Sequence, residues 1–164
     1  MKYNGYLPND FVNGENVCVS LWVSGCPLKC KGCQNPETWS FENGKEVPSN
    51  LIEQLKTAIA ANGIRRNFSV LGGEPLAKQN IQFVDNVINE IRENFPKIKI
   101  FLWTGYTIEE LNSLSEFKNN TFKQRILKNI DVLIDGRFEQ EQRDISLKWR
   151  GSKNQRILYK GKDF

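Results

Sequence analysis

The sequence contains no histidine among its 164 residues. The chain therefore cannot form His-containing zinc sites or His–Cys nucleophile pairs, and it lacks the most common general base of enzymes. It also lacks any apolar run near the ~20 residues that a membrane-spanning helix needs. Residues 1–6 have no apolar core of the kind found in signal peptides. We therefore expect a protein of the cytoplasm that does not bind membranes.

The length and composition are typical of one globular domain. The chain is 39% hydrophobic and 26% charged, and a domain of this size buries about 68–70% of its unfolded surface without needing disulfides. We therefore predict a single compact domain over residues 1–164. The net charge of +4 is too small to indicate direct binding of nucleic acid. Basic residues are concentrated in residues 143–164, which predicts a solvated tail or a segment that faces a partner protein.

Strand-like and helix-like segments alternate along the chain. Apolar, β-branched runs predict strands at residues 17–23, 68–71, 98–103 and 131–135. Apolar residues at helical spacing predict helices at residues 51–59, 81–95, 107–114 and 122–128. Asn50, followed by Glu53 three residues later, predicts the N-terminal cap of the first helix. This alternation favours an α/β fold with a parallel sheet and right-handed crossovers.

Glycine-rich or polar loops follow all four predicted strands. In a parallel α/β sheet, ligands bind beyond the carboxyl ends of the strands, and these ends meet at one edge. Glycines at such ends also let the backbone approach a ligand closely. We therefore predict one site built from four loops: the cysteine loop at residues 24–36, Gly72-Gly73-Glu74-Pro75, Thr104-Gly105 and Asp135-Gly136-Arg137.

Three of the four cysteines, Cys26, Cys30 and Cys33, lie within one stretch of eight residues. In a reducing compartment this clustering indicates a metal site rather than disulfides. Structural zinc needs four ligands, usually in two separated pairs. An iron–sulfur cubane held by only three thiolates keeps one iron open for chemistry. We favour the cubane and keep two alternatives, incidental cysteines and a zinc site completed by Cys18, although Cys18 suits a buried core position on its strand.

The three-cysteine motif followed by Gly-Gly-Glu-Pro resembles the radical S-adenosylmethionine superfamily. Further segments, which together span residues 6–158, narrow the resemblance to the activating proteins of anaerobic (class III) ribonucleotide reductase. Gly32 stands where much of the superfamily has an aromatic residue, and this favours the reductase activators over the pyruvate formate-lyase activators. The segments are Asp10-Phe11-Val12-Asn13-Gly14, residues 25–26, 30–35, 38–39, 102–106 and 134–136, and Trp149-Arg150-Gly151-Ser152 with Asn154-Gln155-Arg156.

The resemblance implies a partial, incomplete β/α barrel with a 4Fe-4S cluster on Cys26, Cys30 and Cys33. It implies that S-adenosylmethionine binds to the open iron and is cleaved to methionine and a 5′-deoxyadenosyl radical. This radical would take a hydrogen atom from one glycine of the reductase large subunit, after a flavodoxin-like protein has reduced the cluster. Transfer of a hydrogen atom needs no general base, which agrees with the absence of histidine. The cofactors carry the chemistry and the protein orients them.

The resemblance also implies which residues contact S-adenosylmethionine. The turn Gly72-Gly73-Glu74-Pro75 matches the contact with the methionine amino group. Polar residues at turns can also be simple turn formers. With that alternative open, the remaining predicted contacts are Asn35, Thr104, Gly105, Asp135 and Arg137.

Two other functions remain open. Another small radical enzyme, such as a pyruvate formate-lyase activator or a deazapurine synthase, would share the cluster and differ in its target. A non-catalytic metal-binding module or electron carrier would share the cysteines but would not consume S-adenosylmethionine. The segment 149–156 has three interpretations. It engages the partner or closes the site, Trp149 packs it onto the sheet, or Arg150 reaches the cofactor.

Overall fold

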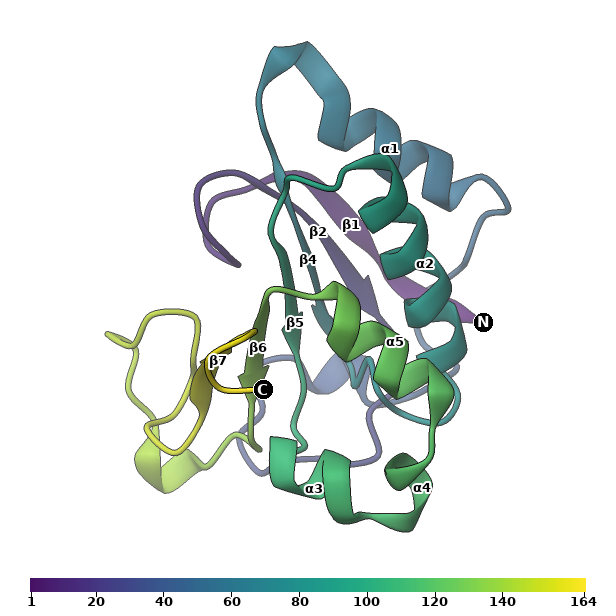
Figure 1. Ribbon diagram of the computed structural model, residues 1–164. Coiled ribbons are helices and arrows are strands. Elements are labelled where there is room, and N and C mark those ends of the chain that lie inside the picture. The colour runs from purple at the N-terminus through teal and green to yellow at the C-terminus, as the bar shows by residue number, and fades with distance from the viewer.

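A seven-stranded sheet with its main helices on one face organises the chain (Figure 1). The computed structural model describes residues 1–164, and the strand order is β3-β1-β2-β4-β5-β6-β7. The four central strands are parallel and correspond to the four that the sequence predicts, with small shifts at their ends. They are β2 (Cys18–Val23), β4 (Asn67–Gly72), β5 (Ile100–Trp103) and β6 (Val132–Asp135).

The predicted parallel sheet is confirmed in the centre, but the strands toward both edges are antiparallel. β1 (Lys2–Asp10) pairs with β2 on one side and with the short β3 (Lys45–Glu46) on the other. At the opposite edge, β7 (Arg156–Tyr159) pairs with β6. The register between β1 and β2 shifts twice. Such bulges break the regular alternation by which a strand is recognised in a sequence.

The helices connect the parallel strands. In Figure 1, α1, α2 and α5 lie on the same side of the sheet. The helices are α1 (Leu51–Ala60), α2 (Ile81–Asn94), α3 (Ile108–Ser113), α4 (Ser115–Lys118) and α5 (Thr121–Asn129). None of them is both long and apolar enough to cross a lipid bilayer.

Asn50 stands at the predicted N-cap position of α1, but its side chain accepts a hydrogen bond from Gln54 Nε2 and makes no capping bond to a backbone N–H. The capping box of the fold is instead at α3. There the Thr107 side chain accepts from the Glu110 N–H and the Glu110 side chain accepts from the Thr107 N–H. This cap fixes the start of a helix that directly follows the Thr104-Gly105 loop.

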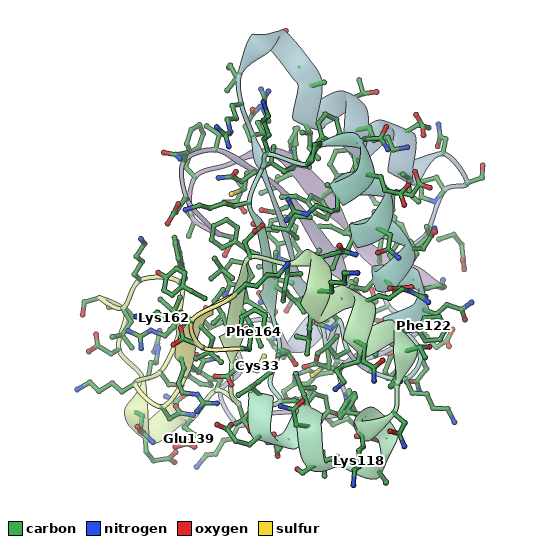
Figure 2. All side chains as sticks on the ribbon, viewed as in Figure 1. Cys33, Lys118, Phe122, Glu139, Lys162 and Phe164 are labelled. Atoms are coloured by element: carbon green, nitrogen blue, oxygen red, sulfur yellow. The ribbon has the colours of Figure 1, made fainter.

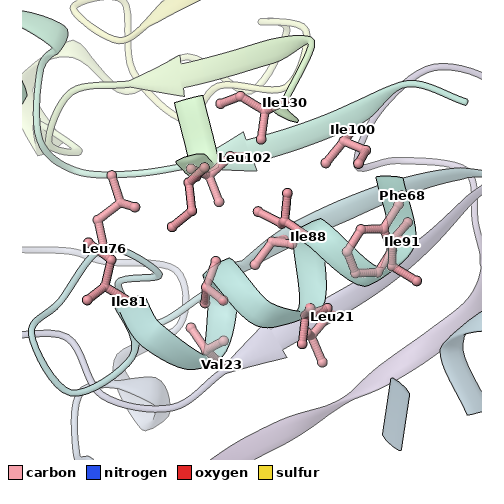
Figure 3. Packing of buried hydrophobic residues seen from close by; sticks show 14 of the residues in the cluster. Leu21, Val23, Phe68, Leu76, Ile81, Ile88, Ile91, Ile100, Leu102 and Ile130 are labelled. Carbon is pink, nitrogen blue, oxygen red and sulfur yellow. The ribbon is translucent and has the colours of Figure 1, made fainter. Parts of the chain in front are cut away.

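The main core lies between the sheet and its helices. One side of each central strand carries fully buried apolar residues, such as Leu21, Phe68 and Leu102, which face Ile88 and Ile91 of α2 (Figure 3). Alternate side chains of a strand point to opposite faces of the sheet, so these positions leave a second set for the other face. The helix layer therefore covers only one of the two faces.

The C-terminal segment packs on the second face of the sheet. Phe101, Val132 and Ile134 are buried there, and Trp103, Trp149 and Ile157 pack against them. Residues 143–164 contribute β7 and a bridge between Arg143 and Ser152. They are therefore a folded part of the sheet and not a free tail. That they face a partner protein stays a prediction.

A buried ion pair fastens this segment to the sheet. Asp135, at the end of β6, is fully buried and accepts hydrogen bonds from Arg156 Nε at 2.9 Å and from the Ile108 N–H at 2.9 Å. Arg156 is partly exposed and also pairs with Glu109. One carboxylate thus joins β6 to both β7 and α3.

We predict that Arg156→Ala lowers the free energy of unfolding by about 2–4 kcal/mol, because it leaves the buried Asp135 carboxylate without its counter-ion. Arg137→Ala is the matched control. It removes an arginine whose partner, Glu110, is half-buried at the surface, and we expect a cost below about 1 kcal/mol. Denaturant titration of both variants measures the two costs. Equal losses would show that the buried pair is not what holds β7.

Candidate functional site

A small cleft of about 160 Å³ opens where β2, β4, β5 and β6 end. Its volume is below the roughly 300–1,000 Å³ that is usual for sites that enclose a whole small molecule. It brings together loops that are far apart in the sequence. Nine of the predicted site residues line it, namely Cys26, Cys30, Cys33, Asn35, Gly72, Gly73, Glu74, Thr104 and Gly105.

The cysteine loop is folded so that its three thiols reach this cleft. The N–H groups of Gly25 and Cys26 donate to the carbonyls of Thr38 (2.7 Å) and Trp39 (3.0 Å), which closes the loop at its base. All three thiols are free and half-buried, and Figure 2 shows Cys33 in the lower half of the view, toward which β6 points. Gly32 has a positive φ of 73°. The loop therefore needs a flexible residue just before its last cysteine.

The chemistry of the cleft fits a bound metal cluster. Burial raises the pKa of Cys26 to about 11 and also raises the pKa of Cys30. No lysine or arginine lines the cleft, although the charge of Arg137 acts to lower the pKa of Cys30. Bound metal would stabilise the thiolates further. No three Cys, Asp or Glu side chains stand close enough to hold one metal ion together. A cubane does not need such a group, because its thiolates bind separate irons.

Cys18 does not belong to this group. It lies on β2, is fully buried and is absent from the cleft lining. Burial raises the pKa of its thiol to about 11. A Cβ on Gly14 would lie only 2.6 Å from its sulfur, which shows how tightly it is packed. The interpretation of Cys18 as a core residue is confirmed, and a zinc site completed by Cys18 does not fit the structure.

Glu74 ties the end of β4 to the end of β5. It is 1% exposed, and its carboxylate accepts hydrogen bonds from Thr104 Oγ1 (2.8 Å), the Gly105 N–H (2.8 Å) and the Leu76 N–H (2.9 Å). Burial raises the pKa of Glu74 to about 7. The residue predicted as a ligand contact therefore also holds together two of the loops that form the cleft.

Asn80, at the start of α2, joins the cysteine loop to the end of β4. Its Nδ2 donates to the carbonyls of Ser24 and Glu74, both at 2.9 Å, and to that of Gly25 at 3.3 Å. One side-chain amide thus joins the exits of β2 and β4. Sequence reasoning missed Asn80, because an asparagine at a helix start predicts only a cap, and this one makes no capping bond.

The glycines of the cleft pack loops against one another. A Cβ on Gly73 would lie 2.4 Å from the Gly25 carbonyl oxygen, and one on Gly105 would lie 2.3 Å from Leu28 Cδ1. At Gly32, a Cβ would lie 1.9 Å from Gln140 Oε1. The small residue before the third cysteine therefore leaves room for the segment after β6. Glycine is needed at Gly73 whether or not a ligand approaches it.

Three predicted site residues do not line the cleft: Pro75, Asp135 and Arg137. Asp135 faces Arg156, and Arg137 pairs with Glu110 and stacks over the Tyr106 ring at 5.6 Å. Two further lining residues, Leu28 and Gly136, lie in loops that the sequence assigned to the site, although they were not named as contacts. The lining residues outside the predicted loops are Thr38, Trp39, Leu71, Trp103, Phe138 and Gln155.

Trp149 packs onto the second face of the sheet, which supports the packing interpretation of this segment. Its ring meets Phe101 edge-on at 5.2 Å, and its Nε1 donates to the Gly14 carbonyl at 3.0 Å. Its own carbonyl accepts from Trp103 Nε1 at 2.8 Å. Since Trp103 lines the cleft, the segment touches the wall of the site. Arg150 is not among the lining residues.

We predict a pH-dependent cost from Glu74 in cluster-free protein. The pKa of the Glu74 carboxyl group rises from 4.5 to about 7 on folding. The folded protein therefore binds this proton more tightly than the unfolded chain does. Its contribution to stability is complete below pH 4.5 and is lost as the pH rises to about 7, by on the order of 3 kcal/mol. Glu74→Gln does not titrate. The difference in unfolding free energy between wild type and Glu74→Gln should therefore shift in favour of the variant over this pH window, and a constant difference would contradict the assignment.

Comparison with known proteins is consistent with this site. Residues 12–158 match the family model described as a 4Fe-4S single cluster domain. Proteins named anaerobic ribonucleoside-triphosphate reductase-activating protein are similar over nearly the whole chain. The one from Pasteurella multocida is 39% identical and the alignment covers 98% of both chains. The one from Vibrio cholerae is 40% identical, covering 96% of this chain and 97% of the relative.

The similarity extends to a relative from Escherichia coli with the same name, which is 36% identical over 94% of this chain and 96% of its own. The matched region contains all three cysteines of the cleft and the four loops that form it. The chain therefore belongs to the 4Fe-4S single cluster domain family and, within it, to the anaerobic ribonucleoside-triphosphate reductase-activating proteins.

Proposed function

We propose that this protein activates an anaerobic ribonucleoside-triphosphate reductase by generating a glycyl radical on it. The observation that carries the proposal is the convergence of three free thiols and the Gly72-Gly73-Glu74 turn on one cleft. The names of the relatives supply the target, since they are activating proteins of that reductase.

We infer that Cys26, Cys30 and Cys33 hold a 4Fe-4S cluster and leave one iron free for S-adenosylmethionine. When bound, these two groups supply the reductive cleavage of S-adenosylmethionine and the abstraction of a hydrogen atom from glycine. The chain supplies position and shielding. Apolar side chains of Leu28, Trp103 and Phe138 line the cleft and restrict water.

The polar groups at the strand ends are the proposed contacts to S-adenosylmethionine. Gly72, Gly73 and Glu74 form the proposed amino-group contact, and the further candidates in the lining are Asn35, Thr104 and Gly105. Pro75, Asp135 and Arg137 remain candidates only if their loops move, because the last two have partners elsewhere.

The fold supports a partial β/α barrel. Each parallel strand adjoins the next, and the edge strands β3 and β7 leave the sheet unclosed. We propose that residues 1–164 act as one domain of the radical S-adenosylmethionine type. The four free thiols suit the cytoplasm, and we propose a flavodoxin-like protein as the electron donor.

We predict that anaerobically reconstituted protein binds about four irons per chain, as one cubane requires. Cys26→Ala, Cys30→Ala and Cys33→Ala should each lose most of this iron, because three thiolates are the whole proposed ligand set. Cys18→Ala is the control, since it removes a thiol outside the cleft. Iron analysis and visible absorbance measure the outcome. Full iron retention in Cys30→Ala would rule out this ligand set.

We predict that the reduced protein converts S-adenosylmethionine to methionine and 5′-deoxyadenosine and raises a glycyl-radical signal on the reductase. Chromatography detects the products, and electron paramagnetic resonance detects the radical. Pyruvate formate-lyase, mixed separately with the protein, should stay silent. A signal on the lyase alone would change the target while keeping the chemistry. The absence of 5′-deoxyadenosine with a fully reduced cluster would refute the radical mechanism.

A further inference from the structure

Two loops hold large apolar side chains out in the solvent. Phe11 and Val12, in the turn between β1 and β2, are 73% and 74% exposed. Ile145, at the tip of the turn between Arg143 and Ser152, is 87% exposed. Single exposed apolar residues are ordinary, but several on one side of a molecule can mark an interaction surface. We call these three residues the apolar tips.

The first tip is held rigidly. Asp10 Oδ1 accepts hydrogen bonds from the N–H groups of Val12 (2.8 Å) and Asn13 (3.1 Å), and Ser69 Oγ donates to the Asn13 carbonyl. Gly14 has a φ of +125°, and no Cβ would fit there against Cys18 and Phe101. The turn is therefore fastened on both sides of two side chains that make little contact with the rest of the fold.

The second tip is held in the same way. Asp144 Oδ1 accepts from the Ser146 N–H at 3.0 Å, and the Asp144 N–H donates to the Gly151 carbonyl at 3.1 Å. Ile145 lies between these anchored residues and points into solvent. A rigid presentation of apolar side chains lowers the entropy cost of binding a partner.

Trp149 joins the two tips and connects them to the cleft. Its Nε1 bonds to the Gly14 carbonyl, three residues beyond Phe11, and its own carbonyl bonds to Trp103 of the cleft wall. In Figure 1 both loops lie on the left of the view, on the side of the sheet away from α1 and α2. The tips and the cleft wall thus share the face that the helices leave open.

The charge around the second tip is positive. Arg143, Lys148 and Lys153 are exposed on this turn, and Asp144 is its one acidic residue. Lys148 Nζ lies 3.9 Å from the centre of the Trp149 ring, so its charge stays beside the tips. An apolar centre with a basic rim fits a protein surface that combines apolar pockets with acidic residues.

We propose that the apolar tips are the docking surface for the reductase, which presents an apolar and acidic patch to them. This inference rests on the proposed function. The protein substrate is favoured as the occupant because its glycine must enter the cleft, and the tips are linked to the cleft wall along the open face. In this proposal Trp149 holds the two loops in place from inside. Phe11, Val12 and Ile145 contact the reductase.

The test compares the double variant Val12→Asp/Ile145→Asp with Leu114→Asp, a control at a partly exposed leucine between α3 and α4, outside both tips. All proteins carry the reconstituted cluster. At limiting reductase, the double variant should form the glycyl radical about tenfold more slowly or worse, because it loses apolar anchors and meets acidic groups. Iron content, thermal stability and uncoupled cleavage of S-adenosylmethionine should match wild type. Lys148→Glu should weaken activation less than the double variant does. The effect of Lys148→Glu should be larger at low salt than at high salt.

The possible results distinguish a failure of the docking surface from a failure of the proposed function. If the double variant activates the reductase as fast as wild type, the docking surface is refuted and the proposed function stands. If wild type raises no glycyl radical at all, the proposed function fails and takes the docking surface with it. A slower reduction of the cluster by flavodoxin, with normal activation under a chemical reductant, would assign the tips to the electron donor. A change in sedimentation would assign them to a second copy of the chain. Either result overturns the proposal.

Discussion

The site depends on a small hydrogen-bonded junction between three strand ends. The Glu74 carboxylate binds the loop after β5, and Asn80 binds the carbonyls that leave β2 and β4. These groups are almost fully buried, so their bonds do not compete with water. Backbone bonds support the same junction, because the N–H groups of Gly73 and Glu74 donate to the carbonyls of Val23 and Gly25, both at 2.8 Å. These backbone bonds and the two buried side chains together place the cysteine loop beside the Gly-Gly-Glu turn.

The same junction explains why the cleft carries so little charge of its own. Glu74 is the one ionisable carboxyl group in the lining, and burial raises its pKa to about 7. The thiols of Cys26 and Cys30 also have raised pKa values. Without metal, these raised pKa values keep the site close to neutral. A cluster held by the three proposed thiols would replace their protons with iron and would supply positive charge that no arginine or lysine of the lining supplies.

Sequence reasoning located the centre of the fold and of the site, but not their edges. The four parallel strands are apolar runs buried on both faces, and strands of this kind can be predicted from the sequence alone. β1 lies next to the short edge strand β3 and pairs with β2 through two register shifts, and β7 is a partly exposed edge strand. Both features weaken the pattern by which a strand is recognised. The three cysteines of the cleft were predicted from their chemistry, and the other lining motif residues from their place at the strand ends and from the resemblance to a known family. Asn80 and Phe138 were not predicted, because their roles arise from proximity that only the folded chain creates. The resemblance also gave Asp135 as a ligand contact, but in the structure its buried carboxylate faces Arg156.

Trp149 connects regions that are far apart in the sequence. Its backbone has a φ of +57°, which is unfavourable for a tryptophan. The strain is balanced by two hydrogen bonds, to Gly14 and from Trp103, and by the edge-on contact with Phe101. All three partners belong to the open face of the sheet. A residue held in a strained conformation by three separate segments has few alternative positions. The outer loops and the cleft wall are therefore positioned by the same residue, through its side chain and its backbone carbonyl. A partner that binds the loops meets a cleft whose wall is already in place.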